Sequence, residues 1–169
     1  MTSEAVVVGP PDQLTEPWLR AVGVADQDLL RDWRNANRAA FFEAAVVDED
    51  GQRRWFRGYL GRADDFLFLV MAGDVPVGCV GVRLVDDGWD VYNVIRGVRT
   101  AASRGFMGRG LRMAVAFARG RRDLPVTAVV LAANPAVAWY AQQGFVIVGR
   151  RPESVVMRWA GPVEVAGIP

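Results

Sequence analysis

The sequence predicts an α/β (α+β) domain with a mixed central sheet of about seven strands and about four helices. Two observations predict this class. Three short apolar segments follow one another between residues 66 and 98, separated by tight turns, which is typical of an antiparallel meander. From residue 108 onward, a helical period alternates with strand-like apolar runs, which is typical of a sheet covered by helices.

The first half of the chain is expected to supply one strand, two helices and the meander. Residues 18–24 alternate weakly and predict a strand, after which Asp26 is placed to cap a helix through Trp33. A second helix is expected from about residue 48 to residue 60, because its aromatic residues recur at spacings of three and four. The meander strands are expected at 66–71, 75–84 and 89–98, with turns at Gly73-Asp74 and Asp86-Asp87-Gly88.

The second half is expected to continue as helix, strand, helix and two strands. Between residues 108 and 119, apolar side chains recur on one helical face. The continuous apolar run 126–132 predicts a strand at the sheet centre. Pro135 suits the first turn of a helix that ends at Gly144, and two closing strands are expected at 145–148 and 154–159.

The chain is expected to fold as one domain spanning residues 16–160. Its 169 residues suit a single domain of ordinary size. Residues 1–15 are polar and contain proline, so a loose lead-in is expected there, with a similar loose tail at 161–169. We expect a cytoplasmic protein without membrane contact, because no apolar run reaches 18 residues and the start lacks a secretory pattern.

Composition removes several kinds of site. The chain has no histidine and no lysine, which excludes Ser-His-Asp and Cys-His catalysis, lysine Schiff bases and nearly all zinc sites, so no metal site is expected. The single cysteine, Cys79, lies in an apolar run and is expected to be a buried small hydrophobic residue. A formal net charge of +1 argues against a nucleic-acid partner.

A glycine-rich stretch from residue 103 to residue 111 follows a predicted strand and opens a predicted helix. Unpaired N–H groups at a helix start attract anions, and Arg104 and Arg109 add charged donors. The stretch is therefore a candidate phosphate-binding loop, although it could equally serve only to turn the chain. A Walker loop is excluded by the absence of lysine, and the third glycine of a dinucleotide fingerprint is missing.

The same stretch resembles motif A of the GNAT superfamily of N-acetyltransferases, R/Q-x-x-G-x-G/A. Two registers are open, one on Gly108 and Gly110 and one centred on Gly105. The resemblance implies a GNAT-like three-layer fold and acetyl-CoA as the cosubstrate, with its pyrophosphate on the loop amides. The implied cofactor-binding residues are Val98, where the preceding strand would pair with pantetheine, and Arg104, Gly105, Phe106, Met107, Gly108, Arg109 and Gly110.

Residues 134–145 resemble motif B of the same family. Tyr140 stands four residues before Gly144-Phe145, as the family's tyrosine does, and Asn134 is an implied cofactor contact. When an amine attacks the thioester, coenzyme A leaves as a thiolate, which a nearby phenol can stabilise or protonate. Tyr140 is therefore the implied catalytic acid. The alternative is a core tyrosine whose hydroxyl bonds a backbone carbonyl.

Residues 30–56 resemble one branch of the family, which includes ribosomal-protein N-terminal acetyltransferases and acetyltransferases of nucleotide-linked amino sugars. The resemblance implies an acceptor that is a small-molecule amine or a protein N-terminus. Dimers are common in this family, so a homodimer is one expected assembly. The implied substrate contacts are Trp33, Phe41, Phe42 and Tyr92, with core packing as the alternative for Trp33.

Without histidine, a carboxylate must take the proton from the amine, directly or through water. Glu43 and Asp90 are the two candidates, because they lie in the segments that face the acceptor in the resembled family. The sequence thus predicts acetyl transfer to a primary amine by direct attack in a ternary complex. Two alternatives stay open: transfer of another acyl group on the same scaffold, and a non-catalytic module that binds or senses coenzyme A.

Overall fold

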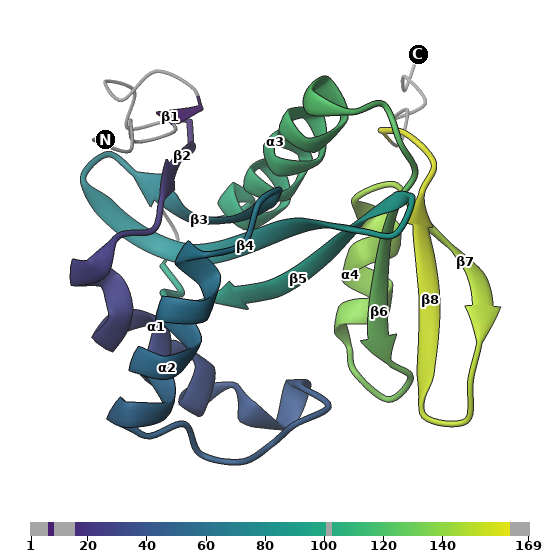
Figure 1. The fold of residues 1–169 in the computed structure, drawn as a ribbon. Helices are drawn as coiled ribbons and strands as arrows, with labels where there is room; N and C mark the ends of the chain where they lie inside the picture. Colours follow the sequence, from purple (N-terminus) through teal and green to yellow (C-terminus); the bar gives the residue numbers. More distant parts are fainter. Residues whose placement is uncertain (1–6, 9–15, 101–102, 163–169) are drawn as a thin grey trace.

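The computed structural model describes residues 7–8, 16–100 and 103–162. Those ranges form an eight-stranded mixed sheet in the order β1-β2-β3-β4-β5-β6-β8-β7 (Figure 1). The strands are β1 (Val7–Val8), β2 (Trp18–Ala21), β3 (Asp65–Ala72), β4 (Val75–Val85), β5 (Gly88–Arg96), β6 (Val126–Leu131), β7 (Phe145–Arg150) and β8 (Ser154–Trp159). The helices are α1 (Gln27–Ala36), α2 (Glu49–Leu60), α3 (Phe106–Arg121) and α4 (Ala136–Gln142), with 3-10 turns η1 (Val24–Asp26) and η2 (Arg38–Ala40).

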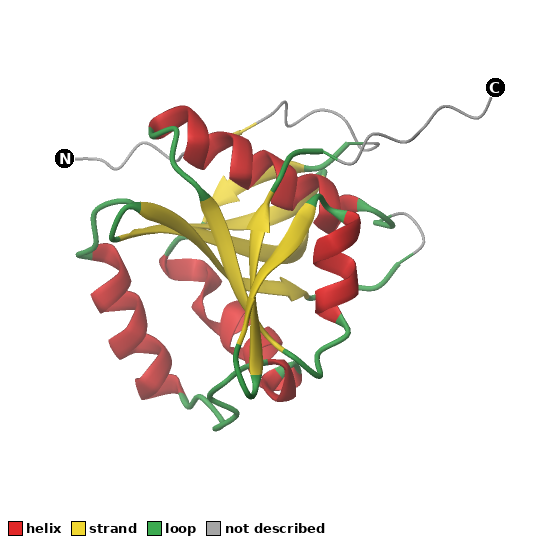
Figure 2. Ribbon diagram, turned by 90° about the vertical axis from the view of Figure 1, so that its right-hand side faces the viewer, coloured by secondary structure: helices red, strands yellow, loops and turns green. Residues whose placement is uncertain are grey.

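The elements form three layers, as predicted. Helices α3 and α4 lie on one face of the sheet, and α1 and α2 lie on the other (Figures 1 and 2). Each face has its own buried cluster. Leu111 and Val115 of α3 belong to the first cluster, and Trp33 of α1 and Phe56 of α2 belong to the second. Alternate residues of a strand point to opposite faces, so the central strands serve both clusters.

The meander β3-β4-β5 confirms the predicted antiparallel pairing. Its two turns contain residues in the left-handed region, Gly73 (φ 57°) and Asp86 (φ 53°), which are residue types that tolerate this region. Strand β5 ends at Arg96, two residues earlier than expected. The later helices and strands follow the predicted order, and α3 is longer than expected by two residues at each end.

Strand β5 carries a bulge and then separates from β6. Its register against β4 runs from Cys79↔Ile95 to Gly81↔Tyr92, so β5 uses one residue more than β4, and Asn93 there has φ 48°. A bulge increases the local twist of a strand. The parallel ladder to β6 spans only three residue pairs, Trp89–Val91 with Val126–Ala128. Within the described chain, the edge of β5 from residue 92 to residue 96 therefore has no partner strand on the β6 side.

Three expectations for the N-terminal part need correction. The lead-in predicted over 1–15 contains β1, which pairs with β2. The strand predicted over 18–24 ends at Ala21, because η1 begins at Val24. Asp26 does not cap α1 with its side chain. Its carboxylate instead accepts the N–H of Gly23 at 2.7 Å and pairs with Arg20 at 2.8 Å, which stabilises η1.

Replacing Gly97 with alanine is expected to destabilise the protein by about 1–3 kcal/mol, the usual cost of overpacking a core. A Cβ at this position would lie 1.9 Å from the ring of Trp33, which is itself buried and cannot move away freely. Urea unfolding measures the change.

Gly120→Ala is the matched control, because a Cβ at this α3 position meets no atom within 4 Å. This variant is expected to gain up to about 1 kcal/mol from helix propensity. Equal stability of the Gly97→Ala variant and the wild type would contradict the described packing of Trp33.

Candidate active site

The start of α3 presents unpaired backbone N–H groups. Gly105 precedes the helix with φ 80°, and the N–H of Phe106 donates to the carbonyl of Ser103 at 3.1 Å. Among the described residues, the N–H groups of Met107 and Gly108 donate no hydrogen bond. Two free N–H groups at the positive end of a 16-residue helix form an anion site. The exposed side chain of Arg104 adds positive charge next to them.

The three glycines of this region have different structural roles. Gly105 alone occupies the left-handed region, and a Cβ there would meet nothing within 4 Å. Gly108 and Gly110 lie inside α3. A Cβ on Gly108 would be 2.4 Å from the side chain of Gln143, and one on Gly110 would be 2.7 Å from Val70. These two glycines therefore allow α3 to pack closely on α4 and β3, and the geometry favours the register centred on Gly105.

The side chain of Arg109 already has two partners within the protein, which limits its availability to a ligand. Its guanidinium pairs with Glu16 at 3.1 Å and lies 4.9 Å from the ring centroid of Phe106. The guanidinium of Arg109 therefore lies along the first turn of α3, and its charge is already paired with the carboxylate of Glu16.

Tyr140 of α4 lies in the same buried cluster as Phe106 and Met107 of the first turn of α3. It is 6% exposed and packs edge-on against Trp139 and Phe145, with ring centroids 5.1 Å and 5.2 Å away. Its hydroxyl has no hydrogen-bond partner in the part of the chain that the structure describes. Burial raises the pKa of Tyr140, and the negative charge of Asp90 raises it further, so the phenol stays protonated well above neutral pH.

Helix α4 links the candidate anion site to the segment between α1 and α2. At its C-terminal end, Gln143 lies against Gly108 and accepts a hydrogen bond from Arg112 of α3 at 2.5 Å. Before its first turn, Asn134 donates from Nδ2 to the carbonyl of Ala40 in η2 at 3.3 Å. Asn134 also accepts the N–H of Ala136 through Oδ1, at 2.9 Å. The structure therefore brings the motif A and motif B segments together.

Asp90 and Tyr92 lie on β5 among polar side chains. Asp90 is half-buried and pairs with Arg83 of β4 at 2.8 Å. Burial raises the pKa of Asp90, Arg83 lowers it, Asp65 raises it, and the net shift is upward. The hydroxyl of Tyr92 donates to Asp65 Oδ1 at 2.5 Å, and the guanidinium of Arg83 lies 4.6 Å from the centroid of its ring. Sequence reasoning missed Asp65 and Arg83, which only the strand register places beside Asp90.

The segment between α1 and α2 holds the remaining candidates in different environments. Phe41 is half-buried beneath the guanidinium of Arg34, 3.7 Å from its ring centroid, whereas Phe42 is 60% exposed. Glu43 is exposed, and its backbone carbonyl accepts a hydrogen bond from Arg34 at 2.6 Å. Trp33 is 8% exposed within the second core cluster, so the packing alternative describes this side chain. The described contacts do not bring Glu43 and Asp90 together.

Val98 lies two residues beyond the end of β5. Its N–H donates to the carbonyl of Val77 at 2.9 Å, so only the Val98 carbonyl is left for a ligand. The unpaired strand edge is instead the stretch from residue 92 to residue 96.

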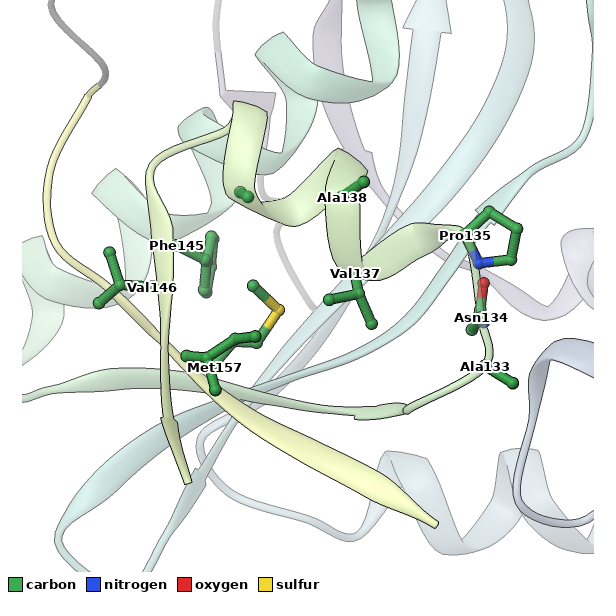
Figure 3. Close-up of a pocket in the computed structure, with 10 residues that line it drawn as sticks. Ala133, Asn134, Pro135, Val137, Ala138, Phe145, Val146 and Met157 are labelled. Atoms are coloured by element: carbon green, nitrogen blue, oxygen red, sulfur yellow. The ribbon is translucent and has the colours of Figure 1, made fainter. Parts of the chain in front are cut away.

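A cavity of about 600 Å³ lies between α4 and the strands β7 and β8 (Figure 3). It is lined by Ala133, Asn134, Pro135, Val137, Ala138, Ala141, Phe145, Val146, Ile147 and Met157. None of these side chains titrates, and none belongs to the glycine-rich loop, so we assign no chemistry to this cavity.

Across the described ranges, neither a helix able to span a membrane nor a cluster able to hold a metal ion is present. No helix there combines the length and the apolar character needed to cross a membrane. No three or more Cys, Asp or Glu side chains in these ranges are grouped to hold a metal ion.

The sequence model of the Acetyltransferase (GNAT) family matches residues 27–145. The chain belongs to the GNAT acetyltransferase family. No curated protein sequence matches this GNAT chain.

Solved structures similar to this GNAT domain agree with its fold. One is apo FdhC, described as a nucleotide-linked sugar GNAT, with a TM-score of 0.73, 14% identity, and coverage of 88% of this chain and 87% of that chain. Another is RimL, a ribosomal L7/L12 α-N-protein acetyltransferase in complex with coenzyme A, with a TM-score of 0.70, 15% identity, and coverage of 85% and 93%. A third is spermidine N-acetyltransferase from Vibrio cholerae in complex with CoA and spermine, with a TM-score of 0.68, 20% identity, and coverage of 85% and 93%. At these identities the likeness shows the fold.

Proposed function

We propose that this protein transfers an acetyl group from acetyl-CoA to a primary amine by direct attack in a ternary complex. One observation carries the proposal: the unpaired edge of β5 runs toward a helix start that has two free N–H groups. A strand edge can pair with the amides of pantetheine, and a helix start can hold a diphosphate. Membership of the GNAT family supports this pairing of features.

The proposed cofactor contacts divide into ligands and supports. The N–H groups of Met107 and Gly108 would bind the pyrophosphate, with Gly105 leaving space for it and Arg104 adding charge. Residues 92–96 and the Val98 carbonyl would pair with pantetheine. Phe106, Arg109, Gly110 and Asn134 would support the site, because each packs or bonds elements that shape it.

Tyr140 is the proposed acid. The amine nitrogen attacks the thioester carbonyl carbon, the C–S bond breaks, and the departing sulfur takes the proton of the phenol. The raised pKa of Tyr140 keeps the phenol protonated at neutral pH, so its O–H is available to stabilise the departing sulfur. Positioning and proton removal supply most of what thioester attack requires, so no acyl-enzyme is needed.

Asp90 is the proposed base. The protonated amine must lose a proton before or during attack. Asp90 is half-buried and acts electrostatically on Tyr140, whereas Glu43 is exposed on the segment between α1 and α2. We therefore place proton removal at Asp90, and assign Glu43, Phe41, Phe42 and Tyr92 to the acceptor side. Two of the similar structures are an α-N-protein acetyltransferase and a spermidine N-acetyltransferase, and their acceptors support a primary amine as the acceptor class.

Cys79 is expected to remain unlabelled when the native protein is treated with a maleimide at pH 8. It is 1% exposed, and burial raises the pKa of its thiol to about 12, so almost no thiolate is present. Mass spectrometry should show complete labelling once urea is added. Rapid labelling of the native protein would contradict the described burial of Cys79. An acetylated Cys79 during turnover would contradict direct transfer.

Calorimetry with acetyl-CoA, followed by an acceptor screen with several acyl-CoAs, tests the proposed function. Binding and thiol release with acetyl-CoA and a primary amine would support it. Faster release with another acyl-CoA would change the donor, and binding without transfer to any amine would indicate a sensing module. No binding of coenzyme A would contradict the proposal.

A further inference from the structure

Three strands place charged side chains side by side on the sheet face opposite α3. Asp65 of β3 is the register partner of Arg83 of β4, which is the register partner of Asp90 of β5. The neighbouring residues Val82 and Val91 point into the cluster beneath α3. Alternation therefore directs Asp65, Arg83 and Asp90 to the other face.

Tyr92 contacts two members of this row, Asp65 and Arg83. Its hydroxyl donates to Asp65 Oδ1, and its ring lies under the guanidinium of Arg83. The ring lies directly over Gly81, where a Cβ would be 2.5 Å from it. Asp65 is thereby held firmly: its side chain is only 3% exposed, and its second oxygen pairs with Arg62 at 3.1 Å.

We propose that Asp65 is a positioning residue for acetyl transfer. Through its contacts with Tyr92 and Arg83 it fixes the side chain of Asp90 toward the amine. Its negative charge also keeps Asp90 able to accept a proton. The proposal rests on the proposed function, in which Asp90 takes the proton of the acceptor. Asp65 itself touches neither substrate nor coenzyme A in this scheme.

The charges around Asp90 show why such a residue is needed. Arg83 pairs directly with Asp90, and an isolated arginine partner would make that carboxylate a poor base. Burial and the charge of Asp65 oppose Arg83, and they raise the pKa of Asp90 overall. Besides Arg62 and Tyr92, the groups that face this row are Tyr59 of α2, on which the charge of Asp65 acts, and exposed Arg158 of β8, the register partner of Thr127 beside Asp90. Tyr140 of α4 lies in the cluster on the α3 side of the sheet, where the charge of Asp90 still acts on it.

Asp65→Asn tests the proposal, because it removes the charge and keeps the size and an acceptor for Tyr92. Carboxyl-carbon NMR of the full protein should show the titration midpoint of Asp90 moving to lower pH. With the acceptor found in the screen, kcat/KM at neutral pH should fall about tenfold, and its acid limb should move to lower pH. Asp65→Glu keeps the charge and should hold the midpoint near that of the wild type, a rescue that a merely structural role does not predict.

Asp64→Asn is the matched control. Asp64 is the adjacent residue, its φ of 54° suits asparagine, and it pairs with Arg122 of the C-terminal end of α3 and not with the row. It should leave both the Asp90 midpoint and kcat/KM unchanged.

An unmoved Asp90 midpoint in the Asp65→Asn variant would overturn the proposal, and so would a moved midpoint with kcat/KM within twofold of the wild type. A wild-type protein that acetylates no amine would instead contradict the proposed function, and the catalytic role of Asp65 with it. An active wild type with an unchanged Asp65→Asn variant would contradict this inference alone.

Discussion

The Tyr140→Phe variant is expected to lose about 100-fold to 1,000-fold in kcat while binding acetyl-CoA as tightly as the wild type. General acid catalysis by a positioned side chain contributes a factor of this order. The change removes one hydroxyl that has no hydrogen-bond partner among the described residues, and the ring keeps its packing against Trp139 and Phe145. The thermal midpoint should therefore stay near that of the wild type, so a lower rate would report lost chemistry. Single-turnover thiol release and calorimetry measure the two quantities.

Tyr59→Phe is the matched control, because it deletes the same group from another tyrosine of the same domain. The Tyr59 hydroxyl accepts the N–H of Leu67 at 3.0 Å, so this variant should lose about 1 kcal/mol of stability and keep its kcat. An unchanged kcat in Tyr140→Phe would show that the leaving thiolate needs no phenol, and Tyr140 would then be a packing residue.

A carboxylate introduced at Gly105 is expected to weaken acetyl-CoA binding roughly 100-fold. A like charge about 6 Å from a phosphate costs about 3 kcal/mol at an effective dielectric near 20. Gly105→Asp adds that charge where a Cβ meets no other atom, so no contact inside the protein is disturbed. The fold should survive, because aspartate tolerates the left-handed region and an acidic group is favourable at a helix start.

Gly105→Asn separates charge from shape. Asparagine has nearly the same size and the same tolerance of φ 80°, but it carries no charge. We expect its dissociation constant for acetyl-CoA to stay within a few-fold of the wild type, as measured by calorimetry. Equal weakening in both variants would mean that steric occlusion, and not repulsion, governs this turn. If neither variant weakens binding, the pyrophosphate does not bind at the start of α3.

Local patterns predicted most of the fold. The meander followed from apolar segments and turn residues, and α3 followed from apolar residues on one face, because both signals lie in neighbouring residues. The predictions went wrong where a distant contact decided the outcome. β1 exists because Val7 and Val8 pair with β2. The Asp26 carboxylate pairs with Arg20 and therefore does not cap α1.

The candidate site was predictable in its segments but not in its charges. Motif spacing located the start of α3 and Tyr140 without structural information. The partners of Asp90 depend on strand register, and a shift of one residue would turn each side chain to the opposite face. The bulge at Asn93 is such a shift, and no pattern in the sequence marked it. Composition likewise could not distinguish exposed Glu43 from half-buried Asp90.

The brevity of the ladder between β5 and β6 has a consequence for cooperative unfolding. Three residue pairs join the N-terminal five strands to the C-terminal three, so the core cluster beneath α3, which includes Leu111 of α3 together with Tyr140 and Met157, must supply much of the remaining coupling. A molecule lodged between the two halves would add contacts that exist only in the intact protein, and mass action then makes global stability rise with its concentration. On the proposed function, resistance of the C-terminal half to proteolysis should therefore rise with the concentration of acetyl-CoA.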